Sequence, residues 1–225
     1  MADFTGFTDQ TIPLLDELPD FTRDDYAERK TEVVAAITDP AKAFVDAMIE
    51  ELQETMSPGI TGAAKVNGSI SPLNNDLRFA KAGTPLYKDH LLLWFWEGAS
   101  KKTSPLLAIR LHATGVGFAS GMGFDKDQLE RWRSLVASDD GNAVASLVAS
   151  VEKRGGELDG QTLKRVPKPF DEDHDRAELL KYKSAQLRYV EPVPASVTKA
   201  SFVGWCGKRL ARLEPLHRLF VDRIA

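Results

Sequence analysis

Leu91-Leu-Leu-Trp-Phe-Trp96 is the first of three short apolar segments in the middle of the chain, and these segments decide the fold. Leu106–Leu111 and Val116–Met122 follow it. Each segment is rich in aliphatic or aromatic residues and is bounded by turn residues, which is typical of β-strands. The connections, Glu97–Pro105 and Ala113–Gly115, are too short to hold the crossover that a parallel pair needs. The sequence therefore predicts antiparallel hairpins.

Helical patterns flank this strand-rich centre. Asp39-Pro40 predicts a helix start with proline in the first turn, and Asp125-Lys-Asp-Gln128 has the spacing of a capping box. The other predicted strands are one added from Ile70 and Leu77–Phe79 and a return strand within Glu157–Lys164. The other predicted helices before the centre are one through Ile12, Leu15 and Leu18 and one with a capping box at Thr22 and Asp25. After the centre we expect a helix ending at Arg154–Gly156, a helix from Asp173 to about Lys183 capped by Asp173 or Asp175, and helices after Ser196.

We therefore expect an α+β fold, with a mainly antiparallel sheet built from central hairpins and packed by N-terminal, middle and C-terminal helices. We expect a single domain over residues 1–225. Its parts are N-terminal helices at 8–55, a sheet-rich centre at 66–124, a helix pair at 125–154, and a strand, basic loop and C-terminal helices at 157–225. Neither a dinucleotide-binding glycine motif nor a phosphate-loop lysine motif is present in the sequence.

The composition is that of a globular protein, with 43% hydrophobic and 28% charged residues among 225. A net charge of -4 argues against a general binder of nucleic acid or of anionic membranes. No apolar run approaches the roughly 20 residues that span a bilayer. Cys206 is the single cysteine, which rules out an intrachain disulfide, and we expect a cytoplasmic protein. The oligomeric state is left open.

Two segments, 75–88 and 163–184, mix basic residues, prolines, aromatic residues and acids. Arginine matches a carboxylate or phosphate with a planar fork, and lysine adds a mobile point charge. If the segments meet in space, they form a basic pocket for a small anionic ligand, rimmed by Phe79, Tyr87 and Phe170. The residues predicted to bind this ligand are Arg78, Lys81, Tyr87, Lys88, Arg110, Lys164 and Arg165.

The alternative is a non-enzymatic interaction or structural module, in which the same cations are solvated or form internal ion pairs. No reaction follows from the sequence. In an enzyme, Asp76 or His174 would supply acid–base chemistry. The acidic run Asp171–Asp175 is explained by helix capping, so no metal and no cofactor are expected. The four histidines are scattered, and the predicted role of Trp94 and Trp96 is core packing.

The two segments resemble a family of conserved hypothetical proteins called domain of unknown function 2461. That family carries a central Arg-Asp-x-Arg-Phe-Ser-Lys-Asp-Lys-x-Pro-Tyr-Lys motif, which Asn75–Pro85 and Tyr87-Lys88 follow with Leu86 as an extra residue. Its later segment is matched by Lys164–Pro167, Phe170–His174 and Leu179–Lys183. The resemblance spans nearly the whole chain.

This chain departs from the family pattern at several charges. Asn75 stands where the family has arginine, and Ala82-Gly83 replaces an Asp-Lys pair. An early Asn-Asn-Arg-x-Trp-Phe feature is represented only by Asp20–Tyr26. The resemblance implies a fold-level neighbourhood and candidate positions, and it brings no activity with it.

Overall fold

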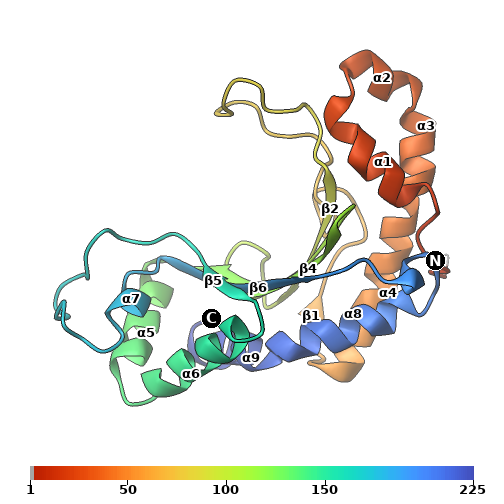
Figure 1. The fold of residues 1–225 in the computed structure, drawn as a ribbon. Coiled ribbons are helices and arrows are strands. Elements are labelled where there is room, and N and C mark those ends of the chain that lie inside the picture. The colour runs from red at the N-terminus through yellow and green to blue at the C-terminus, as the bar shows by residue number, and fades with distance from the viewer. Residues whose placement is uncertain (1–2) are drawn as a thin grey trace. The chain divides into compact units, whose positions relative to one another are not determined.

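The fold is α+β, as the sequence predicts (Figure 1). The computed structural model describes residues 3–225, within which six strands form an antiparallel sheet of order β1-β2-β3-β4-β6-β5. The hairpin prediction is therefore confirmed for the three central segments. The strands are β1 (Ile60–Thr61), β2 (His90–Glu97), β3 (Leu106–His112), β4 (Gly115–Gly123), β5 (Glu157–Asp159) and β6 (Ser184–Glu191).

Helices precede, separate and follow the strands. The α-helices are α1 (Thr11–Glu17), α2 (Arg23–Glu28), α3 (Lys30–Val33), α4 (Asp39–Thr55), α5 (Lys126–Ala137), α6 (Gly141–Glu152), α7 (Ala177–Leu180), α8 (Phe202–Leu210) and α9 (Glu214–Arg223). The other helical segments of the described chain are three 3-10 turns, η1 (Leu18–Asp20), η3 (Ala195–Thr198) and η4 (Ala211–Leu213), and one π-helical turn, η2 (Val34–Thr38). Within residues 3–225, no helix has both the length and the apolar character needed to cross a membrane.

The chain forms two compact units, each assembled from separate stretches of sequence. Unit 1 holds the chain up to Phe95, together with Ala108–Gly117 and Glu191–Arg209. Unit 2 holds Trp96–Leu107, Phe118–Val190 and Leu210–Ala225. Strands β2, β3 and β4 each contribute residues to both units. The single domain over 1–225 stays a prediction.

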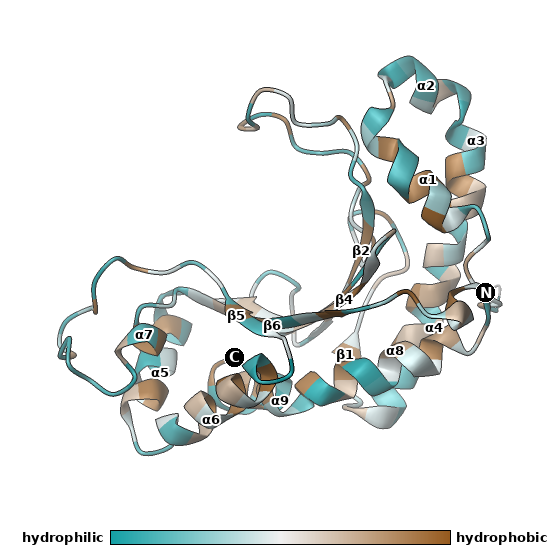
Figure 2. Ribbon diagram, in the orientation of Figure 1, coloured by the Kyte–Doolittle hydropathy of each residue, from teal (hydrophilic) through white to brown (hydrophobic). Residues whose placement is uncertain are grey.

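Unit 1 has a core of aromatic and aliphatic side chains around α4. Phe44, Met48 and Leu52 recur at helical spacing and are fully buried. The Phe44 ring stacks on Phe202 of α8, with ring centroids 5.4 Å apart. Figure 2 shows the corresponding brown stretches along α4 and α8. The apolar stripe of α4 thus provides the surface on which α8 packs in this unit.

Unit 2 is organised around Trp132 of α5, which is fully buried. Its ring stacks on Phe124 at a centroid distance of 5.3 Å and lies 6.1 Å from Phe220 of α9. The indole Nε1–H donates to the carbonyl oxygen of Leu179 at 3.1 Å. That bond satisfies the one polar group of an otherwise apolar side chain.

The predicted helix from Asp173 to about Lys183 is wrong in extent and in capping. Helix α7 covers only Ala177–Leu180, and its N-cap is Arg176, with no side-chain cap bond. Arg176 instead donates from Nε to the carbonyl of Val136 and from Nη2 to that of Ser138 at the end of α5. This long-range anchor holds the chain in a turn where a local cap would have extended the helix.

The predicted strand at Leu77–Phe79 is also wrong. These residues form a turn, and Phe79 is 94% exposed. The chain pairs only where this segment begins and ends, through an antiparallel bridge between Asn74 and Tyr87. We call residues 74–87 the arm. Ile70, the other residue of that predicted strand, does bridge Leu93 of β2 in antiparallel fashion.

Candidate functional site

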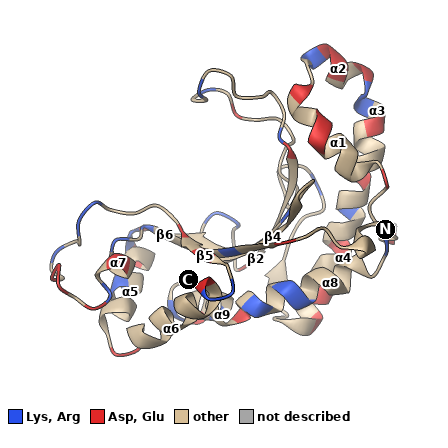
Figure 3. Ribbon diagram, in the orientation of Figure 1, with Lys and Arg blue, Asp and Glu red and all other residues tan. Residues whose placement is uncertain are grey.

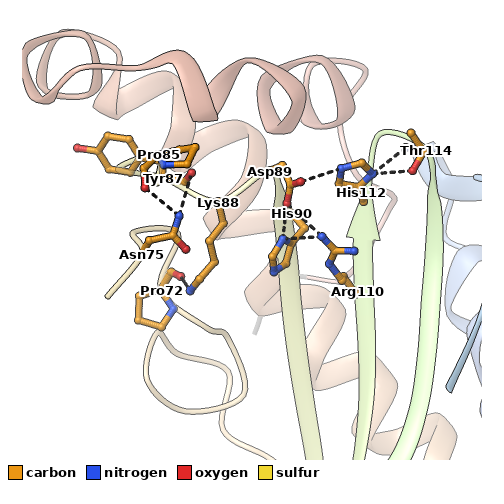
Figure 4. A network of polar contacts seen from close by, with 10 residues as sticks. All are labelled: Pro72, Asn75, Pro85, Tyr87, Lys88, Asp89, His90, Arg110, His112 and Thr114. Atoms are coloured by element: carbon orange, nitrogen blue, oxygen red, sulfur yellow. Dashed lines mark hydrogen bonds and ion pairs between the residues drawn. The ribbon is translucent and has the colours of Figure 1, made fainter. Parts of the chain in front are cut away.

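Four consecutive residues, Tyr87 to His90, lead into β2 in unit 1, and the side chain of each makes a distinct contact (Figure 4). The backbone N–H of Lys88 donates to the carbonyl of Leu73 at 2.7 Å. The side-chain amide of Asn75 donates to the carbonyl of Tyr87 at 3.3 Å. These bonds hold the segment in place, so its side chains project in defined directions.

A pocket of about 330 Å³ lies beside this segment. Tyr26 and Tyr87 stack at its wall with ring centroids 4.4 Å apart and an interplanar angle of 8°. Ile37, Leu91 and Pro72 supply apolar surface. Burial, and then the neighbouring Tyr87, raise the pKa of Tyr26, so its phenol stays neutral at physiological pH. The pocket therefore combines aromatic and aliphatic walls with a few hydroxyl and backbone groups.

Lys88 brings a cation to this pocket. Its ammonium group donates to the carbonyl oxygen of Pro72, a residue of the pocket lining. Partial burial lowers the pKa of Lys88 below the ordinary lysine value of 10.5. A partly dehydrated ammonium with one backbone partner retains two N–H donors for an incoming acceptor.

Asp89 accepts hydrogen bonds from three side chains on two strands (Figure 4). Its Oδ1 lies 2.5 Å from His90 Nδ1 and 3.1 Å from Arg110 Nη2, while its Oδ2 lies 3.1 Å from His112 Nε2. Arg110 and His112 are two residues apart on β3, so they share a face of that strand.

The hydrogen bonds determine the tautomer of each histidine. The backbone N–H of Thr114 donates to Nδ1 of His112 at 3.0 Å, so the neutral ring carries its proton on Nε2 and donates it to Asp89. At 2.5 Å from a carboxylate oxygen of Asp89, His90 Nδ1 carries a proton. The same nitrogen lies 3.0 Å from Arg110 Nη2, and that contact then joins two donors. The lone pair of neutral His90 is therefore on Nε2, and no hydrogen bond to that atom is found among residues 3–225.

Asp89 is ionised and His90 is neutral at physiological pH. Burial opposes ionisation of Asp89, but the hydrogen bond from His90 and the charges of His90, His112 and Arg110 outweigh it, and its pKa lies below 3.8. Burial lowers the pKa of His90 below 6.5, and the positive charges of Arg110 and Lys88 add to this effect, against the hydrogen bond and charge of Asp89.

Three of the predicted ligand-binding residues, Tyr87, Lys88 and Arg110, belong to this region of unit 1. Arg78 and Lys81 lie on the arm instead, and Arg78 forms a bidentate pair with Asp76, whose closest atoms are 2.6 Å apart. That pairing, by its hydrogen bonds first and its charge second, lowers the pKa of Asp76 to about 2.

The other predicted cations, Lys164 and Arg165, are exposed residues of unit 2, in the chain between β5 and α7. Their meeting with the first segment stays a prediction, since they belong to a different unit. His174, the other predicted acid–base residue, is also in unit 2. Its Nδ1 accepts the backbone N–H of Arg176 at 2.9 Å, which ties it to the turn before α7.

Sequence reasoning missed Asp89, His90 and Tyr26 as parts of one site. The available signal was the adjacent acid–imidazole pair Asp89-His90 at the start of a predicted strand. The alternation of Arg110 and His112 on the next strand would then have placed them across from it. Tyr26 carried no comparable signal, because only folding of α2 onto the arm's base brings it to Tyr87.

Other chemistry-bearing groups do not form a site. Within residues 3–225, no three His, Cys, Asp or Glu side chains are arranged to hold a metal ion. Cys206 is fully buried, and burial raises the pKa of its thiol well above 9.0, so it packs as an apolar residue as expected.

Comparison with known families agrees with the sequence reasoning. The family model described as "Conserved hypothetical protein (DUF2461)" matches residues 10–219. The chain belongs to this family. No curated protein matches the chain. The match covers the pocket, the Asp89 cluster and the arm of this DUF2461 member, and the family description assigns a role to none of them.

Proposed function

We propose that this protein binds a small anionic ligand, bearing a carboxylate or phosphate group, in the pocket beside Tyr26 and Tyr87. The observation that carries the proposal is the position of Lys88, whose ammonium group sits on a carbonyl of the pocket lining. A pocket with apolar and polar walls and a charged group beside it is a common form of small-molecule site.

The size and chemistry of the pocket define the ligand class. A volume of about 330 Å³ lies at the lower end of the range for ligand pockets. The stacked tyrosines offer a flat aromatic surface, which suits a planar or ring-containing ligand body. The anionic group would pair with Lys88. Formation of that pair offsets the cost of keeping a charged lysine partly buried.

An acid–base role fits His90 better than either residue named from the sequence. Asp76 is held ionised by Arg78, and its pKa of about 2 is far from the range in which a carboxylate is an effective base at neutral pH. His90 is neutral, is oriented by Asp89, and has its lone pair on Nε2. If the ligand is a substrate, His90 is the group we expect to accept its proton.

Thermal unfolding in the presence of inorganic phosphate, benzoate and phenyl phosphate tests the proposal. A ligand that binds only the folded protein raises its melting temperature. We expect the ring-bearing anions to raise it more than inorganic phosphate does. Lys88→Ala should abolish the shift, while Lys81→Ala, which removes an exposed arm lysine, should leave it intact.

Two results would count against this function. One is an equal shift in wild type and Lys88→Ala; the other is no shift with any of the three anions. The absence of any shift would favour the interaction module. Two of the cations in the two basic segments have internal partners, Arg78 with Asp76 and Lys181 with Glu178.

A further inference from the structure

The arm exposes an aromatic side chain that nothing in unit 1 covers. Phe79 is 94% exposed, and Leu77 beside it is 40% exposed. Figure 1 shows the arm in yellow, extending beyond the start of β2, and Figure 2 shows apolar colour near its tip. Single exposed apolar residues are common, and this phenyl ring, almost wholly exposed on a projecting loop, is available for contact with another molecule.

The arm is closed by its own backbone contacts, and Figure 3 shows its basic residues in blue. Its base is closed by the Asn74–Tyr87 bridge, and its tip turns through a bond from the Ala80 N–H to the Leu77 carbonyl at 3.3 Å. Arg78 is held against Asp76. Lys81 makes no hydrogen bond or ion pair through its side chain with any of residues 3–225. The arm therefore presents an aromatic ring beside a cation without a carboxylate partner.

A second surface of unit 1 has complementary chemistry. A groove of about 390 Å³ runs along α4, with Phe4, Ala43, Ala47 and Val203 as its apolar part. Five carboxylates line it, and none forms an ion pair within the described chain: Asp3, Asp46, Glu50, Glu51 and Glu54.

Within residues 3–225, the apolar floor of the groove is only partly covered. Ala43 and Ala47 belong to the apolar stripe of α4, yet they stay partly accessible at the groove, while Phe44 and Met48 beside them are fully buried. The carboxylates repel one another, since Asp46, Glu50 and Glu54 recur every four residues on one helix face. An apolar group with a positive charge beside it would fill the floor and relieve the repulsion.

We propose that the arm of one copy of this protein docks in the α4 groove of a second copy. Phe79 inserts against Ala43 and Ala47, and Lys81 pairs with the carboxylates of the groove. The arm of the same chain carries both features that the groove requires, an apolar ring and an adjacent cation, and the family description assigns a role to neither surface. This assembly is independent of the proposed ligand pocket.

The symmetry and the size of the contact define how strongly two copies are expected to associate. One arm in one groove is a heterologous contact, and two copies that exchange arms close into a two-fold dimer with both contacts made at once. Each contact is small, so the dimer is expected to be reversible and to depend on protein concentration. Raised salt should weaken it, because the ion pairs at the rim of the groove are screened.

Sedimentation velocity at increasing protein concentration tests the arm. We expect wild type to shift from monomer to dimer. Phe79→Ser should raise the dissociation constant about tenfold or more, because it removes the buried ring. Val190→Ser is the matched control, since Val190 is 68% exposed and lies outside the arm and the groove. It should leave the dissociation constant unchanged.

A charge exchange tests the groove. Lys81→Glu and Glu50→Lys should each weaken self-association, and mixing the two variants should restore it. In the mixture, the lysine-bearing arm of Glu50→Lys meets an intact groove, and the glutamate-bearing arm of Lys81→Glu meets a groove with an added lysine. A carbodiimide should also join Lys81 to a groove carboxylate across copies, which mass spectrometry reads from a mixture of isotopically light and heavy protein.

The proposal is overturned by a wild-type protein that stays monomeric at every concentration. It is equally overturned by a dimer that Phe79→Ser leaves intact, or by Lys81 cross-links found only within one copy. A monomer whose arm remains exposed would instead indicate another protein as its partner. Melting curves of the variants establish that each is folded, so a lost dimer is not mistaken for a lost fold.

Discussion

At the scale of single residues, hydrogen-bond partners decide what a titratable group can do. Asp89 accepts hydrogen bonds from two histidines and an arginine, and in the sequence only the adjacent His90 sets it apart from other acids. Tyr87, Lys88 and Arg110, predicted from the sequence to bind a ligand, lie in this region of unit 1, and that role stays a prediction. Asp89 was missed because two of its hydrogen-bond donors lie on β3, 21 and 23 residues away in the chain.

At the same scale, His217 is expected to make the free energy of unfolding depend on pH. It is fully buried, and that burial lowers its pKa below 6.5, as does Arg218, against the opposing effects of Glu97 and Asp222. The unfolded chain therefore binds the proton first as pH falls. The stabilisation is fully present above about pH 6.5 and is lost as pH falls from there toward the native pKa. His90 acts in the same direction.

Urea unfolding at about pH 7.5 and at about pH 5 measures this dependence. We expect a lower free energy of unfolding at the acid end in wild type. His217→Gln removes one titrating group, so its free energy of unfolding should change less between the two conditions. His112→Gln, at a half-buried position on β3, serves as a comparison. An equal pH dependence in wild type and His217→Gln would contradict the assignment.

At the scale of elements, local signals predicted helix starts well. Both predicted capping boxes are present: Thr22 with Asp25 at α2, and Asp125 with Gln128 at α5. These signals work because cap and backbone are only three residues apart, so no tertiary contact is needed. The predicted cap before α7 is absent, because a long-range contact outweighs the local signal there. Arg176 reaches carbonyl groups about forty residues away, and that anchor decides the local conformation.

Asp125→Ala tests how much the α5 cap contributes to the free energy of unfolding. The Asp125 carboxylate accepts the backbone N–H of Gln128 at 2.9 Å, and its loss should lower the free energy of unfolding by about 1 kcal/mol. Asp139→Ala removes an exposed acid just before α6 whose side chain makes no hydrogen bond within residues 3–225, and it should change little. Denaturant titration compares the two. Equal effects would show that general charge, and not the cap, is responsible.

At the scale of the whole molecule, the chain runs repeatedly between its two units. Strands β2, β3 and β4 each contain a point where membership changes: between Phe95 and Trp96, between Leu107 and Ala108, and between Gly117 and Phe118. A strand cannot lose its order in one half without weakening the ladder in the other half. This continuity is the physical basis for expecting one domain.

Equilibrium unfolding followed by tryptophan fluorescence tests that expectation. Trp94 and Trp205 report on unit 1, and Trp96 and Trp132 report on unit 2. A double variant, Trp96→Phe with Trp132→Phe or Trp94→Phe with Trp205→Phe, silences the reporters of one unit, and far-UV circular dichroism follows the secondary structure of both units. If the chain is one cooperative domain, fluorescence and circular dichroism give the same midpoint within each variant. Separate midpoints would show that the units unfold independently.

The sequence by itself determined the α+β class, the central antiparallel hairpins, the starts of the capped helices and membership of the DUF2461 family. These properties depend on residue periodicity and on contacts between near neighbours in the chain. Tertiary structure alone decided that Tyr26 stacks on Tyr87, that Asp89 binds two histidines, and that Phe79 stays in water. Each of these depends on where distant segments come to lie, and local patterns carry no information about that.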